Sequence, residues 1–263
     1  MKLLAFFLLL TLSSMPTDKY YVTFVKGDVL LDKTKKPLKV GDVLNPDDKL
    51  IFRDKSSKVS CICTGRGRFD INTQSAKIDS KGELLAVLKS SLISSSATYH
   101  LSTRSLSFEG NDPATYFTSR ETKNHILLIK DEAIPVKSSY KLDGTNFFFI
   151  QYTSNGKTIT HKVDHNGKAL IFSDKLFTTE SGTLVEKVSL CYQTNASGTA
   201  KSSIIAAFTP VIATKEEIIA QLNLLSKIIG TSNKKKLKAE QTNHLFDNYG
   251  KIGEEELARL FGI

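Results

Sequence analysis

Short apolar runs separated by turn residues organise the first third of the chain. Between Tyr20 and Asn72, runs of Val, Ile, Leu, Phe and Tyr alternate with Gly, Pro, Asn and Asp. The runs cover residues 20–25, 29–31, 37–40, 49–52, 59–63 and 69–72. Several short strands at close, even spacing are typical of a small all-β barrel or sandwich.

A second region with the same pattern follows. Its apolar runs cover residues 125–130, 147–152, 158–163, 168–172, 185–192 and 203–212. The pairs Asn155-Gly156 and Asn166-Gly167 separate successive runs, and Asn-Gly between apolar runs is the strongest short hairpin signal. The stretch 195–198 is expected to be the loop between the last two strands. The pattern predicts a six- or seven-strand β-sandwich over residues 120–213.

Two stretches between these regions have helical character. Leu84, Leu85, Leu88 and Leu92 recur at helical spacing, which predicts a helix covering one end of the first module, with an extended pair as the alternative. The Ser-rich residues 90–98 are expected to be a linker. Asp112 is placed to cap a short helix that begins at Pro113.

The last fifty residues change to a helical pattern. Thr214 and Glu217 form a capping box. The apolar stripe behind it ends at Gly230 and consists of Ile218, Ile219, Leu222, Leu225 and Ile229. Two further helices are expected over 233–249 and 254–261. The helices either pack on the second sandwich, which is the favoured alternative, or dock on a partner.

The N-terminus has the pattern of an export signal. Lys2 is followed by an almost purely apolar run from Leu3 to Leu12 and then by small residues. This run is short for a membrane span, which takes about 20 apolar residues. Residues 1–17 are therefore interpreted as a signal peptide, although an uncleaved anchor and a buried N-terminal element stay open. The mature protein is expected in the periplasm or outside the cell.

The predicted fold class is mainly β: a small N-terminal β barrel or sandwich, a second β-sandwich and a helical C-terminal tail. The expected division is a signal peptide at 1–17, a β module with its covering helix at 18–95, a sandwich domain at 120–213 and the tail at 214–263.

Residues 20–72 also resemble a known family. Four segments carry the resemblance: Val25-Lys26-Gly27-Asp28-Val29, Leu38-Lys39-Val40-Gly41-Asp42-Val43-Leu44, Asp47-Asp48-Lys49-Leu50-Ile51 and Ser56-Ser57-Lys58-Val59. Together they are similar to the FecR-type periplasmic domain. The resemblance implies a non-enzymatic β module that receives or relays contacts in the cell envelope of bacteria. Regulators of that type carry a cytoplasmic segment and a membrane span before this domain, so only the module carries over and not sigma-factor control.

Residue chemistry explains the motif at its turn. Gly41 can take a positive φ without a Cβ clash, and Asp42 can accept hydrogen bonds from backbone amides of the turn. Leu38, Val40 and Leu44 are then expected to point inward from the flanking strands.

The charge does not indicate a nucleic-acid partner. The 36 Lys and Arg exceed the 27 Asp and Glu, for a formal net charge of +9, but the basic residues are spread along the chain. The only tight cluster is Lys234-Lys235-Lys236 with Lys238, and it lacks aromatic stacking platforms. A solvated helix face explains this cluster most simply, and contact with an anionic cell surface is the alternative.

The cysteines and histidines do not form a chemical motif. Cys61 and Cys63 lie two apart, so on a strand they face the same side roughly 6.6 Å apart, which disfavours a disulfide between them. A bridge from either to Cys191 stays open, and buried free thiols are the favoured interpretation. His161 and His165 fall on a strand and its turn, where four residues extend about 13 Å, which disfavours a shared metal.

No catalytic, cofactor-binding or metal residue is predicted. The chain has no G-x-S-x-G elbow, phosphate-binding Gly loop or H-E-x-x-H sequence. Asp47-Asp48 is interpreted as a turn, and Glu254-Glu255-Glu256 as the first turn of a helix. The sequence therefore favours an exported, non-enzymatic envelope protein that binds a protein partner. A secreted hydrolase with a site in the second β domain and a structural subunit of a surface assembly remain the alternatives.

Overall fold

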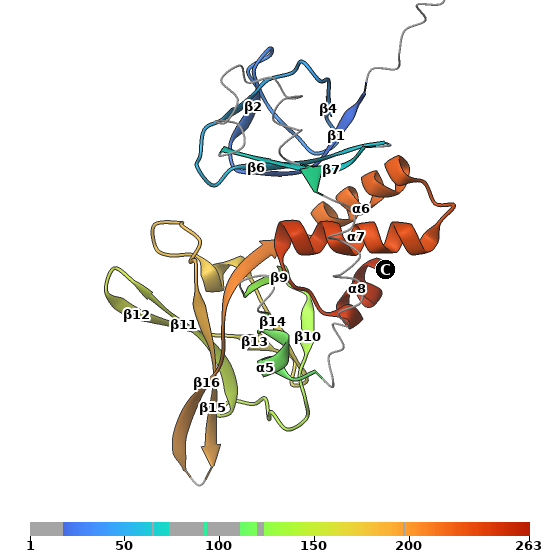
Figure 1. Cartoon of the computed structure of the whole chain (residues 1–263). Helices are drawn as coiled ribbons and strands as arrows, with labels where there is room; N and C mark the ends of the chain where they lie inside the picture. Colours follow the sequence, from blue (N-terminus) through green and yellow to red (C-terminus); the bar gives the residue numbers. More distant parts are fainter. Residues whose placement is uncertain (1–17, 65, 74–91, 94–110, 120–123, 197) are drawn as a thin grey trace, which may run out of the picture. The chain divides into compact units, whose positions relative to one another are not determined.

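A computed structural model describes residues 18–64, 66–73, 92–93, 111–119, 124–196 and 198–263. The signal-like residues 1–17 lie outside the described residues. The chain divides into two compact units, one formed by residues 1–99 with 227–229 and the other by residues 100–226 with 230–263. Strands predominate in both, and the helices of the described part are concentrated at the C-terminus (Figure 1).

The first unit contains two open antiparallel sheets. Its strands are β1 (Tyr20–Lys26), β2 (Val29–Leu31), β3 (Lys36–Pro37), β4 (Val43–Leu44), β5 (Leu50–Phe52), β6 (Lys58–Cys63), β7 (Gly67–Asn72) and β8 (Leu92–Ile93). One sheet has the order β4-β1-β6-β7-β8 and the other has the order β3-β2-β5. Five strands, β1, β2, β5, β6 and β7, coincide with apolar runs of the sequence. The run 37–40 is a strand only at Pro37, and β4 and β8 lie outside the runs. The sheets stay open over the described residues, so the sandwich rather than the barrel describes this unit.

The core of the first unit is built from alternate residues of these strands. Tyr20, Val22 and Val59 are fully buried in it, and both Cys61 and Cys63 point into it from one face of β6. The turn between β1 and β2 brings Gly27 against Ser57. A Cβ on Gly27 would lie 2.3 Å from the Ser57 hydroxyl oxygen, and the φ of Gly27 is +77°. This close approach explains why glycine is needed at this turn.

The second unit also contains two sheets. Its strands are β9 (His125–Ile129), β10 (Ala133–Pro135), β11 (Phe147–Ser154), β12 (Lys157–Lys162), β13 (Asp164–His165), β14 (Ala169–Ile171), β15 (Val188–Ala196) and β16 (Thr199–Ala213). The larger sheet has the order β12-β11-β15-β16-β9, and the smaller has the order β10-β14-β13. Both Asn-Gly pairs connect neighbouring antiparallel strands, as predicted. The sequence pattern missed β10 and β13, which are only three and two residues long.

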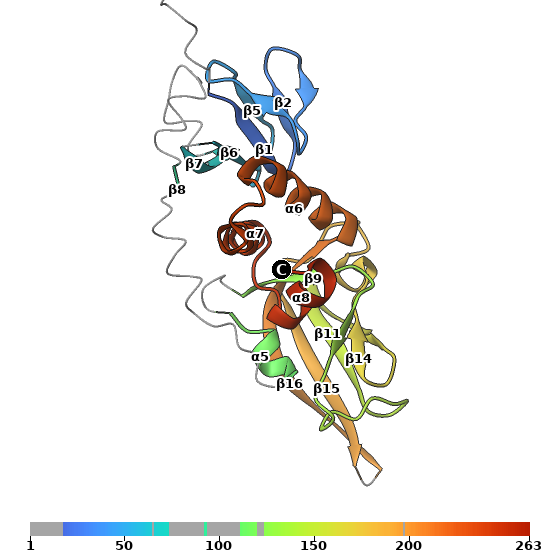
Figure 2. The same cartoon turned by 90° about the vertical axis from the view of Figure 1, so that its right-hand side faces the viewer.

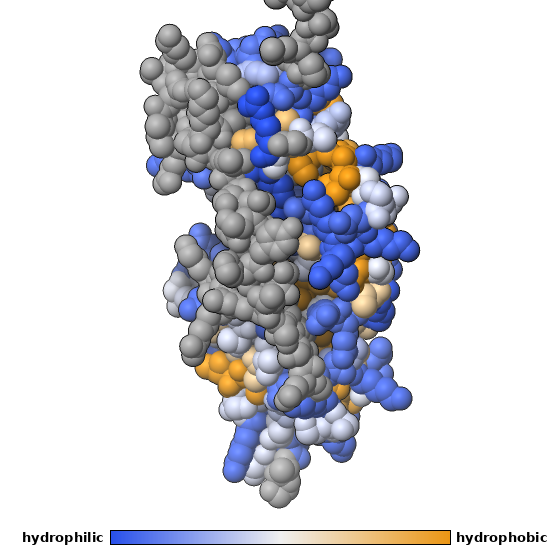
Figure 3. Space-filling model, turned by 45° about the vertical axis from the view of Figure 1, so that its right-hand side comes forward, coloured by the Kyte–Doolittle hydropathy of each residue, from blue (hydrophilic) through white to orange (hydrophobic). Residues whose placement is uncertain are grey.

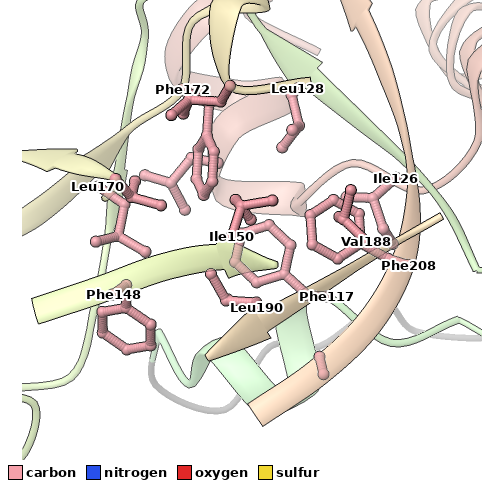
Figure 4. Packing of buried hydrophobic residues seen from close by; sticks show 14 of the residues in the cluster. Phe117, Ile126, Leu128, Phe148, Ile150, Leu170, Phe172, Val188, Leu190 and Phe208 are labelled. Atoms are coloured by element: carbon pink, nitrogen blue, oxygen red, sulfur yellow. The ribbon is translucent and has the colours of Figure 1, made fainter. Parts of the chain in front are cut away.

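An aromatic-rich core fills the second unit (Figure 4). Phe148 and Ile150 of β11 point to the same side of the larger sheet as Leu190 of β15 and Phe208 of β16. Phe117, which follows the short helix α5 (Pro113–Tyr116), packs against Phe208 with ring centroids 4.9 Å apart. Aromatic side chains of this kind bury large apolar areas and dominate the packing energy of such a core.

The short helix α5 forms as the sequence predicts. Asp112 caps it, because its carboxylate accepts a hydrogen bond from the Ala114 amide at 3.0 Å. Pro113 stands at the first helical position, where its missing N–H costs no hydrogen bond. A 3₁₀ turn, η1 (Asp174–Phe177), follows β14 and adds Leu176 and Phe177 to the core.

The C-terminal helices are α6 (Lys215–Ile229), α7 (Lys234–Tyr249) and α8 (Glu254–Phe261). The predicted capping box of Thr214 and Glu217 is present, and Gly230 and Gly250 end α6 and α7. Of the predicted apolar stripe, Ile218, Leu222 and Leu225 are buried, whereas Ile219 is exposed. The three helices lie beside one another in both views (Figures 1 and 2).

The tail packs on its own chain. The segment after α7 adds to the free side of β9: Leu127 donates its amide to the Lys251 carbonyl at 2.7 Å, and Lys251 donates its amide to the His125 carbonyl at 2.9 Å. Between α6 and α7, buried Gln221 hydrogen-bonds both His244 and Tyr249. These contacts confirm the favoured alternative, in which the helices pack on the second β region.

The helix predicted from Leu84, Leu85, Leu88 and Leu92 lies outside the described residues except at Leu92. Leu92, the last leucine of its apolar pattern and part of the predicted linker, belongs instead to β8, which pairs with β7. At that residue the extended alternative is the correct one.

Candidate functional site

Exposed apolar side chains are the first candidates for a binding site in this chain. Among the described residues, five large apolar side chains are exposed: Val40, Val43, Leu184, Ile204 and Ile219. On the face shown in Figure 3, hydrophilic residues predominate among those coloured, and hydrophobic ones reach the surface in separate patches. Val40 and Val43 are the two that belong to one turn, the Gly-Asp turn of the first unit.

The Gly-Asp turn (residues 39–43) is held between two buried leucines. Leu38 is 5% exposed before the turn and Leu44 is 0% exposed after it. Gly41 has a φ of +95°, as the sequence predicts, and a Cβ there would meet no atom within 4 Å. Glycine at this position thus serves the backbone conformation alone and not a close packing contact.

Hydrogen bonds fix the turn to β1. The Gly41 amide donates to the Val22 carbonyl, and the Val22 amide donates to the Asp42 carbonyl, each at 2.8 Å. The Asp42 carboxylate accepts from the Lys39 amide at 2.8 Å, which confirms the predicted role of this aspartate. These hydrogen bonds hold the turn in a defined conformation beside β1.

The prediction for Val40 is wrong. Leu38 and Leu44 point inward as expected, but Val40 is 36% exposed and Val43 is 42% exposed. The positive φ of Gly41 reverses the chain between them, so strand alternation does not continue through the turn. Val43 pairs across the strands with half-buried Tyr21, which extends the apolar surface onto β1. Such a surface offers apolar contacts and no reactive group.

The three cysteines are free and buried, as predicted. Burial raises the pKa of Cys61, Cys63 and Cys191, and the nearby Asp70 carboxylate raises that of Cys61 further. Since the thiolate is the nucleophile, all three thiols lie in surroundings that suppress attack on a substrate.

The two histidines that the sequence singles out point to different partners. His161 of β12 contacts the Tyr152 hydroxyl at 3.3 Å, and His165 of β13 accepts from the Gly167 amide at 3.3 Å. Within the described part of the chain, no group of three or more His, Cys, Asp or Glu residues converges as metal ligands do.

The two acidic clusters lie where the sequence predicts, in a turn and in the first turn of a helix, but each contains one buried member. Asp48 is buried and accepts from the Asn45 amide at 2.8 Å, which makes it part of the predicted turn. Glu254 and Glu255 are exposed at the start of α8, but Glu256 is only 4% exposed. All three glutamates form the first turn of α8, as the sequence predicts. Glu256 differs from its two neighbours because α8 turns its third residue toward α5.

Buried Glu256 accepts a hydrogen bond from the Tyr116 hydroxyl. Burial raises the pKa of Glu256 to about 7, while the Tyr116 hydrogen bond and the Arg259 charge oppose the shift. The Arg259 guanidinium also bonds the Glu132 carboxylate and the Ala133 carbonyl. This group fastens α8 to α5 and to the start of β10 within the second unit. Sequence spacing gave no signal for it because its members lie far apart in the chain.

The lysine cluster of α7 remains on the surface. Lys234, Lys235, Lys236 and Lys238 are all exposed in the first turns of the helix. A solvated helix face therefore describes them as the sequence suggests. No helix in the described ranges is both long and apolar enough to cross a membrane.

Comparisons with known proteins do not place the chain in a family. No family model, curated protein or solved structure matches the chain.

Proposed function

We propose that the chain is an exported, non-enzymatic protein of a bacterial cell envelope whose first unit binds a protein partner through the Gly-Asp turn. The observation that carries the proposal is the exposure of Val40 and Val43 on a turn that buried leucines and backbone hydrogen bonds hold in a defined conformation. A preorganised apolar surface loses little conformational entropy on binding, which favours affinity. The export signal and the resemblance of residues 20–72 to the FecR-type domain support an envelope location and a role in relaying contacts.

The surface fits protein recognition better than chemistry. Apolar side chains with a neighbouring tyrosine supply the kind of contact found at the centre of protein interfaces. The thiols, which are the strongest nucleophiles in the described residues, are buried with raised pKa values. The secreted hydrolase therefore has no observation in its favour.

Cross-linking in intact cells followed by affinity purification tests the proposal. We expect the wild-type chain to recover a specific envelope protein, and the double variant Val40→Lys/Val43→Lys to lose it, because two charges replace the apolar contact. Leu184→Lys is the matched control, since Leu184 is exposed, apolar and part of the other unit. Circular dichroism melts should show that all three proteins are folded. Equal recovery by the wild type and the double variant would overturn the role of the turn.

A further inference from the structure

The hairpin of β15 and β16 extends beyond the sheet that holds it. Strand β11 pairs with β15 only as far as Gln193, and β9 pairs with β16 only from Thr209 onward. Residues 194–196 of β15 and 199–201 of β16 thus form an arm of two strands that pair with each other alone among the described residues. Residues 202–204 of β16 pair with β15 inside the sheet, and no described strand pairs with their other side. Both views show this hairpin projecting from the second unit (Figures 1 and 2). An isolated two-stranded ribbon is marginally stable, so a further strand would stabilise the arm.

The outer edge of β16 lacks the usual protection of an edge strand. Residues 199–204 are all exposed and contain one charge, Lys201, with no proline. Natural edges are commonly blunted by several charges, by proline or by a bulge, and the bulge of β16 lies at Ile205, just outside residues 199–204. The opposite edge of the same sheet, β12, follows that rule, because Lys157 and Lys162 stand at its two ends. Residues 199–204 thus form the edge of this sheet that is open to another strand.

A register shift turns an isoleucine outward at the base of the arm. Leu190 pairs with Ala206 and Cys191 pairs with Ile204, so Ile205 is the additional residue of a bulge. Ile205 packs against the core, whereas Ile204 is 67% exposed, the most exposed large apolar side chain of the described residues. An added strand would cover Ile204.

The charge of the sheet indicates what kind of strand would add. The adjacent strands β12, β11, β15 and β16 contain no Asp or Glu, while they carry Lys157, Lys162 and Lys201. A second copy of this sheet would bring only basic and neutral side chains to the edge and could not neutralise Lys201. Lys157 and Lys162 lie on β12 at the other edge, so an acidic partner added to β16 gains directly from Lys201.

We propose that the edge of β16 over residues 199–204 receives an extended acidic segment of a partner protein as an added β-strand. Backbone hydrogen bonds would supply affinity, and side chains on alternate positions would supply specificity. Lys201 and Ile204 are three residues apart and so face opposite sides of the strand. The partner strand therefore alternates acidic side chains on the Lys201 side with aliphatic ones on the Ile204 side. This site lies in the second unit and is independent of the Gly-Asp turn.

Fluorescence anisotropy with labelled peptides tests the proposal on the full chain. The probe is a peptide of alternating Glu and Val, and its charge-inverted counterpart alternates Lys and Val. We expect the acidic peptide to bind and the basic one not to bind. Lys201→Glu should lower the affinity for the acidic peptide roughly tenfold and allow the basic peptide to bind. Ile204→Ser should lower the affinity for the acidic peptide about fivefold, because an apolar contact is lost. Lys175→Glu, at an exposed lysine of η1, should change neither affinity.

Further measurements separate strand addition from other modes. An acidic peptide N-methylated along one edge keeps its charge but cannot form the backbone ladder, so we expect it not to bind. Equal binding of the methylated peptide, or an unchanged affinity in Lys201→Glu, would overturn the proposal. So would sedimentation data in which the wild type is a dimer that Ile204→Ser dissociates, since a second copy would then occupy the edge. Binding of polygalacturonate, with no binding of the acidic peptide, would overturn it in favour of an anionic polysaccharide.

Discussion

The Tyr116 hydroxyl donates a hydrogen bond to the Glu256 carboxylate and so joins α5 to α8. The two residues lie 140 positions apart in the chain. Both side chains are buried, at 8% and 4% exposure. The nearest cation is held at a distance: Arg259 Nη2 lies 3.9 Å from Glu256 Oε1 and also serves the Ala133 carbonyl. For an ionised Glu256, the favourable interaction energy with these partners is smaller than the hydration free energy lost on burial.

This environment predicts a pH-dependent stability. The pKa of Glu256 is raised from 4.5 to about 7, mainly by burial. A raised folded-state pKa stabilises the fold fully below the unfolded pKa, and this contribution is lost as the pH rises through the folded value. Between about pH 5 and about pH 8, the Glu256 contribution to the free energy of unfolding should fall by on the order of 2 kcal/mol. Urea unfolding of Glu256→Gln and of wild type across this pH range measures the change.

The difference between the two proteins carries the test, since other groups titrate in both. Glu256→Gln keeps an acceptor for Tyr116 and removes the ionisation, so its advantage over wild type should grow with pH. Glu254→Gln, at an exposed position of the same turn, is the control and should parallel wild type. Parallel curves for Glu256→Gln and wild type would show that Glu256 is not held in its neutral form.

Lys251 is a second buried tether of the tail. It is 6% exposed, and its ammonium donates to the Thr115 carbonyl at 2.7 Å and to the Thr118 carbonyl at 2.6 Å. Lys251→Met keeps the aliphatic stem but removes the donor from both carbonyls. We expect a loss of about 2–3 kcal/mol in the free energy of unfolding, measured by urea denaturation. Lys235→Met, at an exposed lysine of α7, should stay within about 0.5 kcal/mol of wild type. Similar values for the two variants would contradict a bonded role for Lys251.

Local signals predicted most elements of the fold. The apolar runs located β1, β6, β11 and β15, because strand formation there depends on residues that are neighbours in sequence. The capping box at Thr214 and the glycines at 230 and 250 marked the ends of α6 and α7 for the same reason. The sequence pattern did not predict β10 and β13, because they are too short to show alternation and form by pairing with β14.

The proposed binding surfaces and the buried Glu256 were less accessible to sequence reasoning. Val40 follows an apolar alternation that predicts burial, and only the chain reversal at Gly41 exposes it. Ile204 and Ile205 are adjacent and are the same residue type. Because of the bulge, Ile204 faces solvent and Ile205 packs against the core. Glu256 resembles its two exposed neighbours until α5 is placed beside it. Each depends on geometry that a one-dimensional pattern does not contain.

Gly250 combines a positive φ with a close approach to β9. Its φ is +102°, and a Cβ there would lie 2.4 Å from the carbonyl oxygen of His125. Because the neighbour is backbone, Gly250→Ala would require the chain after α7 to shift and would weaken its pairing with β9. We expect a loss of about 3 kcal/mol or more in the free energy of unfolding. Thermal and urea unfolding measure it.

Gly230→Ala is the matched control for this glycine. Gly230 also ends a helix with a positive φ, +81°, but a Cβ there would meet nothing within 4 Å. Its substitution should cost only the backbone strain, about 1 kcal/mol. Equal losses in the two variants would mean that the contact with His125 adds nothing to the requirement for glycine.

The thiols provide a direct check on the non-enzymatic proposal. Cys61, Cys63 and Cys191 are free and buried, and burial raises the pKa of each. Since the thiolate is the reacting form, Ellman's reagent at about pH 8 should label none of them in the native protein and all three in concentrated guanidinium chloride. Complete labelling after unfolding is the control that no thiol is oxidised. Rapid labelling of one cysteine in the native protein would identify an accessible, activated thiolate, and a cysteine hydrolase would then explain the chain better than a binding module.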